Sequence, residues 1–439
     1  MKLIAQLEDL LYKAQHAPKK DDLRLSAWRI VVHESEVVAL GIKDNSPGSV
    51  YTPPSYRQGE SGDVFLVWAD GTCSQAMVQL PFASNSEYWH KQIEQWRQAA
   101  YKDPDAVHIP APESLPLVAV EDRAIQTIVS GEDKLVFDQV DQWLRDKPSG
   151  AKMQGRIQAA WGYRHVRTST GLAVTYQQSQ FVTGFSFDSL VGGGFAKRRL
   201  IRPNEQEELW SQTVNQYEWM QKEAAPVGPQ TLVILAPSMT EDMLRQFVLP
   251  NFSGDRVIEG QGAFSKESFQ EHKQVFHEQF SLMIDPLRPL ELGSYLVTPE
   301  GVPAEQTVLV QKGQLKTPFL KVKDAVRWGA KPTAVPQGTA GLYIRHQAEV
   351  PWVKALEGIE DGVLILSVLG LHTQDSVSGS YSLSAPHSLR ILQGQIVGKT
   401  DCKLMGNFFA DLAASTTKTA LSDLDTHPYL ILRTGIQTL

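Results

Sequence analysis

The sequence of 439 residues contains only two cysteines, Cys73 and Cys402. Two cysteines cannot form the disulfide framework of a small secreted domain, and such a low number suits a reducing compartment. The sequence also lacks any apolar run near the roughly 18 residues that a membrane-spanning helix needs. It shows no internal repeat and no low-complexity segment. These absences argue against a disulfide-rich secreted protein, a membrane-spanning protein and a repeat protein, and they predict a cytoplasmic location.

The sequence also has fewer basic than acidic residues. Lys and Arg number 42 against 49 Asp and Glu, so the formal net charge is −7 at pH 7. Nucleic acids and anionic membrane surfaces are bound mainly through basic patches. Hydrophobic residues make up 42% of the chain and charged residues 21%, which is typical of a globular protein. The sequence therefore predicts a globular protein that binds neither nucleic acid nor membrane.

Two proline-rich segments, at residues 108–116 and 225–229, interrupt the hydrophobic pattern. We use them as domain boundaries. They predict an N-terminal α+β domain at residues 1–105, a middle α+β domain at 106–226 and a β-rich C-terminal domain at 227–439. The predicted fold class is therefore α+β, with mixed N-terminal and middle domains and a β-rich C-terminal domain.

Two segments rich in turn-forming residues are expected to lie outside regular structure. Residues 44–62 are dense in Gly, Pro and Ser and should form an irregular loop. Gly192, Gly193 and Gly194 precede a basic run, but they lack the spacing and the Lys-hydroxyl pair of a phosphate-binding loop. A flexible turn is the preferred interpretation of the three glycines.

The stretch from Gly362 to Leu412 carries the strongest pattern. Val363 to Leu366 is a short apolar run of the kind found in buried strands, and small and large residues alternate from Ser378 to Leu383. Gln393-Gly394 between two apolar segments predicts a β-hairpin. We therefore expect this stretch to form a packed β core.

The same residues carry a resemblance to a known family. Gly370-Leu371-His372-Thr373, the run 378–383, the hairpin and Gly406-Asn407-Phe408-Phe409 occur in the order found in the C-terminal domain of the TldD/PmbA family, also called modulator of DNA gyrase. A second block, with Asp285-Pro286 and Glu300-Gly301-Val302-Pro303, is similar to a further run of that family. The family includes cytosolic metallopeptidases, so the resemblance implies a role in proteolysis or peptide maturation.

In the catalytic members of the family, a helix after a buried strand carries His-Glu, three residues and a second His, which together hold zinc. Here Ser238 to Glu241 has the spacing of a capping box and predicts the start of that helix. Aligned on the preceding strand and on Gly254-Asp255, the three motif positions are occupied by Arg245, Gln246 and Pro250. None of these side chains supplies a neutral nitrogen ligand or an acidic group. The resemblance therefore implies a PmbA/TldE-like member without metal, without another cofactor and without catalytic residues of its own.

The resemblance also implies partners. Family members assemble from a zinc-bearing TldD-like subunit and a metal-free one, or as homodimers, and act on peptides. We predict peptide or partner contacts from strand edges, at Glu300, Gly301, His372, Gly379, Ser380, Tyr381, Ser382 and Leu383. Two alternatives remain open at this point: an autonomous peptidase with an unrecognised site, and a structural or regulatory homodimer.

Overall fold

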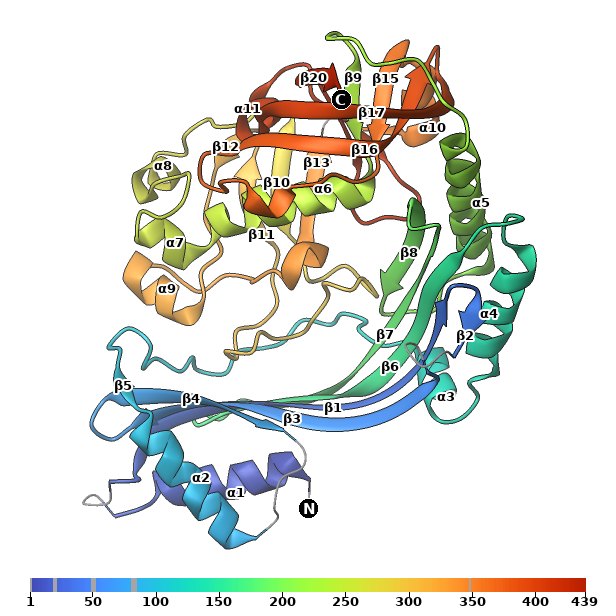
Figure 1. The fold of residues 1–439 in the computed structure, drawn as a ribbon. Helices are drawn as coiled ribbons and strands as arrows, with labels where there is room; N and C mark the ends of the chain where they lie inside the picture. The colour runs from blue at the N-terminus through green and yellow to red at the C-terminus, as the bar shows by residue number, and fades with distance from the viewer. Residues whose placement is uncertain (1, 19–21, 49–52, 80–84, 347–348) are drawn as a thin grey trace.

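The computed structural model describes residues 2–18, 22–48, 53–79, 85–346 and 349–439. Within them, helices and three β-sheets form an α+β fold, which confirms the predicted fold class. Long curved strands form the lower layer in Figure 1, and the C-terminal half lies against their concave side. Among the described residues, no helix is both long enough and apolar enough to cross a bilayer.

The first sheet is antiparallel and has the strand order β5-β4-β3-β1-β6-β7-β8, with β2 paired to β1 beside this path. Its central pair, β1 and β6, stays in register from Arg29 opposite Thr168 to Ile42 opposite Gly155. The strands are β1 (Leu25–Lys43), β2 (Ser46–Pro47), β3 (Ser55–Trp68), β4 (Thr72–Gln79), β5 (Tyr101–Lys102), β6 (Met153–Thr168), β7 (Ala173–Phe187) and β8 (Val191–Lys197).

This sheet corrects both expectations about irregular segments. Strand β3 begins at Ser55, inside the segment 44–62 expected to be a loop, because the long strand β1 offers pairing partners as far as Ala39. The three glycines expected in a turn lie in β8 at the edge of the sheet. A Cβ on Gly193 would stand 2.4 Å from Thr213 Oγ1, so the missing side chain allows α5 (Pro203–Met220) to pack closely on β8.

Helices cover the convex face of the first sheet. Leu3, Leu7 and Leu11 of α1 (Leu3–Gln15) pack with Trp28 and Trp68 of the sheet, as expected for the apolar face of an amphipathic helix. The other helices of this half are α2 (Ser86–Gln98), α3 (Arg123–Val129) and α4 (Lys134–Asp146).

The C-terminal half contains the other two sheets. The smaller has the order β12-β11-β10-β13, and the larger has the order β14-β18-β19-β9-β15-β16-β17-β20. The strands are β9 (Leu232–Leu235), β10 (Phe280–Ile284), β11 (Thr307–Gln311), β12 (Gln314–Leu315), β13 (Leu342–His346), β14 (Val350–Pro351), β15 (Asp361–Ile365), β16 (Ser380–Leu392), β17 (Gln395–Asn407), β18 (Lys418–Leu421), β19 (Tyr429–Leu432) and β20 (Gly435–Thr438).

The predicted hairpin and β core are confirmed. Gln393 and Gly394 connect β16 to β17, and both have positive φ angles, 49° and 75°, as a two-residue hairpin turn requires. Val363 and Ile365 of β15 are fully buried between the two C-terminal sheets, in one apolar cluster with residues of β10 and β16.

One helical segment, at residues 237–252, passes through this cluster. It consists of α6 (Pro237–Met243), the π-helical turn η1 (Leu244–Val248) and the 3₁₀ turn η2 (Leu249–Phe252). Leu244, Phe247 and Phe252 are completely buried. The remaining helical elements are α7 (Gly254–Ile258), α8 (Lys266–Gln270), α9 (Val322–Trp328), η3 (Gly338–Gly341), α10 (Trp352–Glu357), η4 (Leu371–Thr373) and α11 (Phe408–Ala413).

The concave face of the first sheet contacts the C-terminal half directly. Val31 and Val166 pack against Val297, and Arg29 forms an ion pair of 3.2 Å with Glu300. Since β1 and β6 belong to one sheet, the segments before and after the first proline-rich stretch share their hydrogen bonding. The division into domains at residues 1–105, 106–226 and 227–439 stays a prediction.

Candidate functional site

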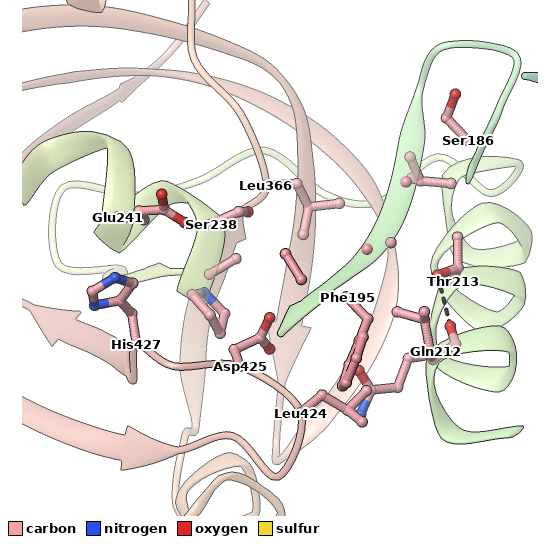
Figure 2. A pocket seen from close by; sticks show the side chains of 18 of the residues that line it. Ser186, Phe195, Gln212, Thr213, Ser238, Glu241, Leu366, Leu424, Asp425 and His427 are labelled. Atoms are coloured by element: carbon pink, nitrogen blue, oxygen red, sulfur yellow. Dashed lines mark hydrogen bonds between the residues drawn. The ribbon is translucent and has the colours of Figure 1, made fainter. Parts of the chain in front are cut away.

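A cavity of about 690 Å³ lies where the first sheet meets the C-terminal half. Four elements enclose it: the edge strand β8, helix α5, the start of α6 and the loop between β18 and β19 (Figure 2). Its polar lining residues include Gln212, Ser238, Glu241, Asp425 and His427. A cavity that combines polar side chains from distant parts of the chain is the usual form of a ligand site.

The end of β9 determines how α6 enters the cavity. The structure corrects the predicted capping box, because Ala236 is the N-cap and Pro237 occupies the first helical turn. Proline suits this position, since its fixed φ angle matches the helix and its missing N–H would have no partner there. Ser238 therefore does not cap the helix and instead lines the cavity one turn before Glu241 (Figure 2).

Three titratable side chains meet in this cavity. Glu241 Oε1 accepts hydrogen bonds from Arg245 Nη2 at 2.8 Å and from Thr339 Oγ1 at 2.6 Å. Burial raises the pKa of Asp425, and the nearby Glu241 carboxylate acts in the same direction. Burial also lowers the pKa of His427, which favours the neutral imidazole at pH 7. The cavity therefore contains carboxylates beside a neutral ring that can both donate and accept a hydrogen bond.

Arg245, Gln246 and Pro250, which were predicted to occupy the positions of the family's zinc motif, lie farther along the same helical segment. Arg245 is 59% exposed and pairs with Glu241 and Asp242 of the preceding turn. Gln246 donates from Nε2 to the carbonyl oxygen of Gln374 at 2.8 Å, and Pro250 lies in η2. Each residue thus has a structural role: an ion pair, a contact to the 370–379 loop, and the 3₁₀ turn.

These residues do not fit a zinc ion. A catalytic zinc takes His, Cys, Asp or Glu donors and keeps one position open for water. Arg, Gln and Pro supply no such set, and nowhere in the described parts of the chain do three or more His, Cys, Asp or Glu side chains gather in a way that could hold a metal. No step through zinc is therefore assigned to this chain.

The predicted contact residues at 379–383 lie at the start of β16. Tyr381 and Leu383 point into the apolar cluster, whereas Ser380 and Ser382 alternate to the exposed face. Gly379 has φ 72° and faces the ring of Phe409, where an added Cβ would stand 2.5 Å from Cδ2. Only the two serines are thus placed to touch a peptide or a partner from this segment.

The other predicted contact residues lie elsewhere. Glu300 binds Arg29 and accepts a hydrogen bond from the backbone N–H of Val322 at 2.7 Å. Gly301, with φ 88°, packs near Leu172 of the first sheet. His372 is exposed in η4, so it is accessible to a peptide or a partner. Glu300 and Gly301 thus lie against the first sheet, whereas η4, which carries His372, contacts β16. None of these residues lines the cavity.

The sequence analysis did not identify the titratable side chains of the cavity as a site. The segment Asp425-Thr426-His427 has no recognisable motif, and Glu241 was noted only as part of a capping box. Their proximity arises because β19 and β9 are hydrogen-bonded neighbours, so the loop entering one strand faces the helix leaving the other. A strand-pairing prediction for these two segments could have supplied the missing signal.

A further titratable group, Asp411, lies outside the cavity, beneath the predicted contact segment. Tyr381 donates its hydroxyl to Asp411 Oδ2 at 2.7 Å, and burial raises the pKa of Asp411 to about 6. Because the folded state prefers the protonated acid, this residue stabilises the fold below about pH 4, and the contribution disappears as the pH rises through about 6. We expect Asp411→Asn to reduce the loss of stability between pH 4 and pH 7 by about 2 kcal/mol. Urea unfolding at both pH values measures this difference.

Asp401→Asn, on an exposed position of β17, is the matched control and should leave the pH dependence unchanged. An Asp411→Asn protein whose stability falls with pH as steeply as that of the original chain would contradict the assignment.

Comparisons with known proteins agree with this fold. Residues 229–434 match the model of the PmbA/TldA metallopeptidase C-terminal domain. The chain is similar to the uncharacterized protein MJ0231 of Methanocaldococcus jannaschii, with 23% identity over 63% of this chain and 67% of that protein. It is also similar to a metalloprotease of Methanothermobacter thermautotrophicus, with 22% identity over 52% of each chain. Among solved structures, TldE of Thermococcus kodakarensis has a TM-score of 0.79 and 18% identity, over 98% of this chain and 100% of that one.

The chain is thus an α+β protein with the fold of TldE, and its C-terminal part is related to metallopeptidases. Residues 229–434 belong to the PmbA/TldD family, as its C-terminal domain.

Proposed function

We propose that this chain is a PmbA/TldE-like subunit that does not cleave peptides itself and that acts with a zinc-bearing TldD-like subunit. In this proposal the pair degrades or trims peptides in the cytoplasm. The chain contributes a wall of the chamber and surfaces that hold extended peptide, including Ser380 and Ser382.

The proposal depends on which side chains occupy the positions of the zinc motif and on what those side chains contact. Arg245 is a permanent cation engaged by two carboxylates, and it cannot donate a lone pair to a metal. Gln246 replaces the acid that would manage the proton of a zinc-bound water, and its amide is hydrogen-bonded to Gln374. The family fold is thus combined with a helix that serves packing and ion pairing at the positions of the metal ligands.

The test compares this chain, a zinc-bearing family member from the same genome, and their mixture. We expect this chain alone to contain far less than one zinc per chain and to leave an unfolded peptide intact. The mixture should cleave the peptide and should lose activity when the partner's zinc motif is mutated. Arg245→Ala in this chain is the matched variant, and it should leave cleavage by the mixture unchanged because this residue holds no metal.

Stoichiometric zinc together with cleavage by this chain alone would overturn the proposal in favour of an autonomous peptidase. A stable homodimer that neither binds nor affects the zinc-bearing relative would favour a structural or regulatory role.

A further inference from the structure

Asp425 is the carboxylate in the cavity that lacks a cationic partner. Its Oδ2 accepts a hydrogen bond from Ser422 Oγ at 2.6 Å, and within the described residues no Lys, Arg or His nitrogen lies within 4.0 Å of it. Figure 2 shows its side chain between Phe195 and His427, on the loop that closes the cavity. The side chain is exposed, so a ligand can reach it, and the surrounding protein weakens the hydration of the carboxylate enough to raise its pKa. This position therefore favours a cationic group from outside the chain.

His427 supplies the second, independent observation. The residue is 4% exposed, and within the described structure neither ring nitrogen forms a hydrogen bond of good geometry, although the backbone of Thr339 lies close enough to affect the pKa of the ring. Buried polar groups nearly always find a partner, so two unsatisfied ring nitrogens facing a cavity indicate a ligand that completes them. A neutral imidazole can accept from an ammonium and donate to a neighbouring carbonyl at the same time.

The other charged side chains of the cavity are already engaged. Lys197 is the one cation among the described lining residues, and its Nζ binds Glu291 at 2.9 Å. Glu241 accepts from Arg245 and Thr339, which compensates its charge. Within the described parts of the chain, Asp425 thus remains the carboxylate of the cavity without a compensating positive charge, and His427 the ring whose nitrogens can still form hydrogen bonds with a ligand.

We infer that the cavity is a binding site for a primary ammonium group, with Asp425 as its counter-ion and His427 as its hydrogen-bonding partner. The volume of about 690 Å³ has room for more than the ammonium alone, so the rest of the ligand lies along β8 and α5. A lysine side chain and the amino terminus of a peptide both offer this chemistry. The inference does not depend on zinc, on a partner subunit or on peptide cleavage.

The experiment uses the whole isolated chain and small probes, with binding measured by calorimetry. N-acetyl-lysine amide carries its only positive charge on the side chain, and triglycine amide carries it on the amino terminus. N-acetyl-norleucine amide has a similar shape to the lysine probe and no charge. We expect one of the two cationic probes to bind at least tenfold more tightly than the norleucine probe, and the stronger of them identifies the source of the ammonium.

Asp425→Asn should weaken that binding at least tenfold, while Asp423→Asn, an exposed neighbour outside the cavity lining, should not. The thermal midpoint of both variants verifies that they fold. The His427 ring proton signals should shift when the probe binds to the original chain, and this measurement needs no variant.

Equal affinity for the charged and uncharged probes, or undiminished binding to a folded Asp425→Asn protein, would overturn the inference. Failure to bind either cationic probe would overturn it as well. None of these results affects the proposed subunit role, which is judged by zinc content and cleavage in the mixture.

Discussion

Replacing Phe247 with alanine should lower the free energy of unfolding by about 4 kcal/mol. Phe247 is fully buried in η1, and its ring lies 5.7 Å from the ring of Phe408 and 6.4 Å from that of Tyr381. Removal of the ring loses its apolar burial and leaves a cavity that the surrounding sheets cannot easily close. Urea unfolding followed by circular dichroism measures the change.

The matched control is Phe137→Ala. This phenylalanine, on α4, is 38% exposed and packs less tightly, so its removal should cost less than about 1 kcal/mol. If Phe247→Ala proves no more destabilising than Phe137→Ala, the segment 237–252 is not the centre of the C-terminal core.

Gly162→Ala is expected to destabilise the first sheet by about 3 kcal/mol, at the upper end of the range for overpacking. A Cβ at this position would stand 1.8 Å from the carbonyl oxygen of Glu34 on the neighbouring strand β1. Because the obstructing atom belongs to the backbone, no side-chain rotation relieves the contact, and β1 and β6 must separate. Thermal unfolding and hydrogen exchange of the β1 and β6 amides measure this effect.

Gly184→Ala in the adjacent strand β7 is the control for this substitution. There the nearest atoms to an added Cβ are 3.4 Å and 3.7 Å away, so alanine fits without displacement. Similar thermal midpoints for the two variants would show that the close approach at Gly162 does not constrain the sheet.

The local sequence pattern was sufficient to predict those elements whose conformation depends on residues close by in the chain. Gln393-Gly394 specifies its hairpin because the turn geometry needs residues that tolerate positive φ angles. The prediction of a turn from local composition was wrong at Gly192 to Gly194, because these glycines lie in strand β8. There the close packing of α5 on Gly193, a contact between distant segments, decides the conformation.

The predicted peptide contacts show the same limit. Alternation along residues 379–383 correctly predicts a strand, but it cannot tell which face is covered. The ring of Phe247 and the hydroxyl bond to Asp411 hold Tyr381 inside, which leaves Ser380 and Ser382 outside.

The sequence by itself determined the α+β class and the β core, because these follow from composition and local periodicity. The assignment of Arg245, Gln246 and Pro250 to the zinc positions is what the family resemblance implies, and it stays a prediction. The tertiary structure alone decided that Asp425 and His427 share a cavity with Glu241. The reason is strand pairing: hydrogen bonds between β9 and β19 join segments far apart in the chain, and no local pattern records which strands become neighbours.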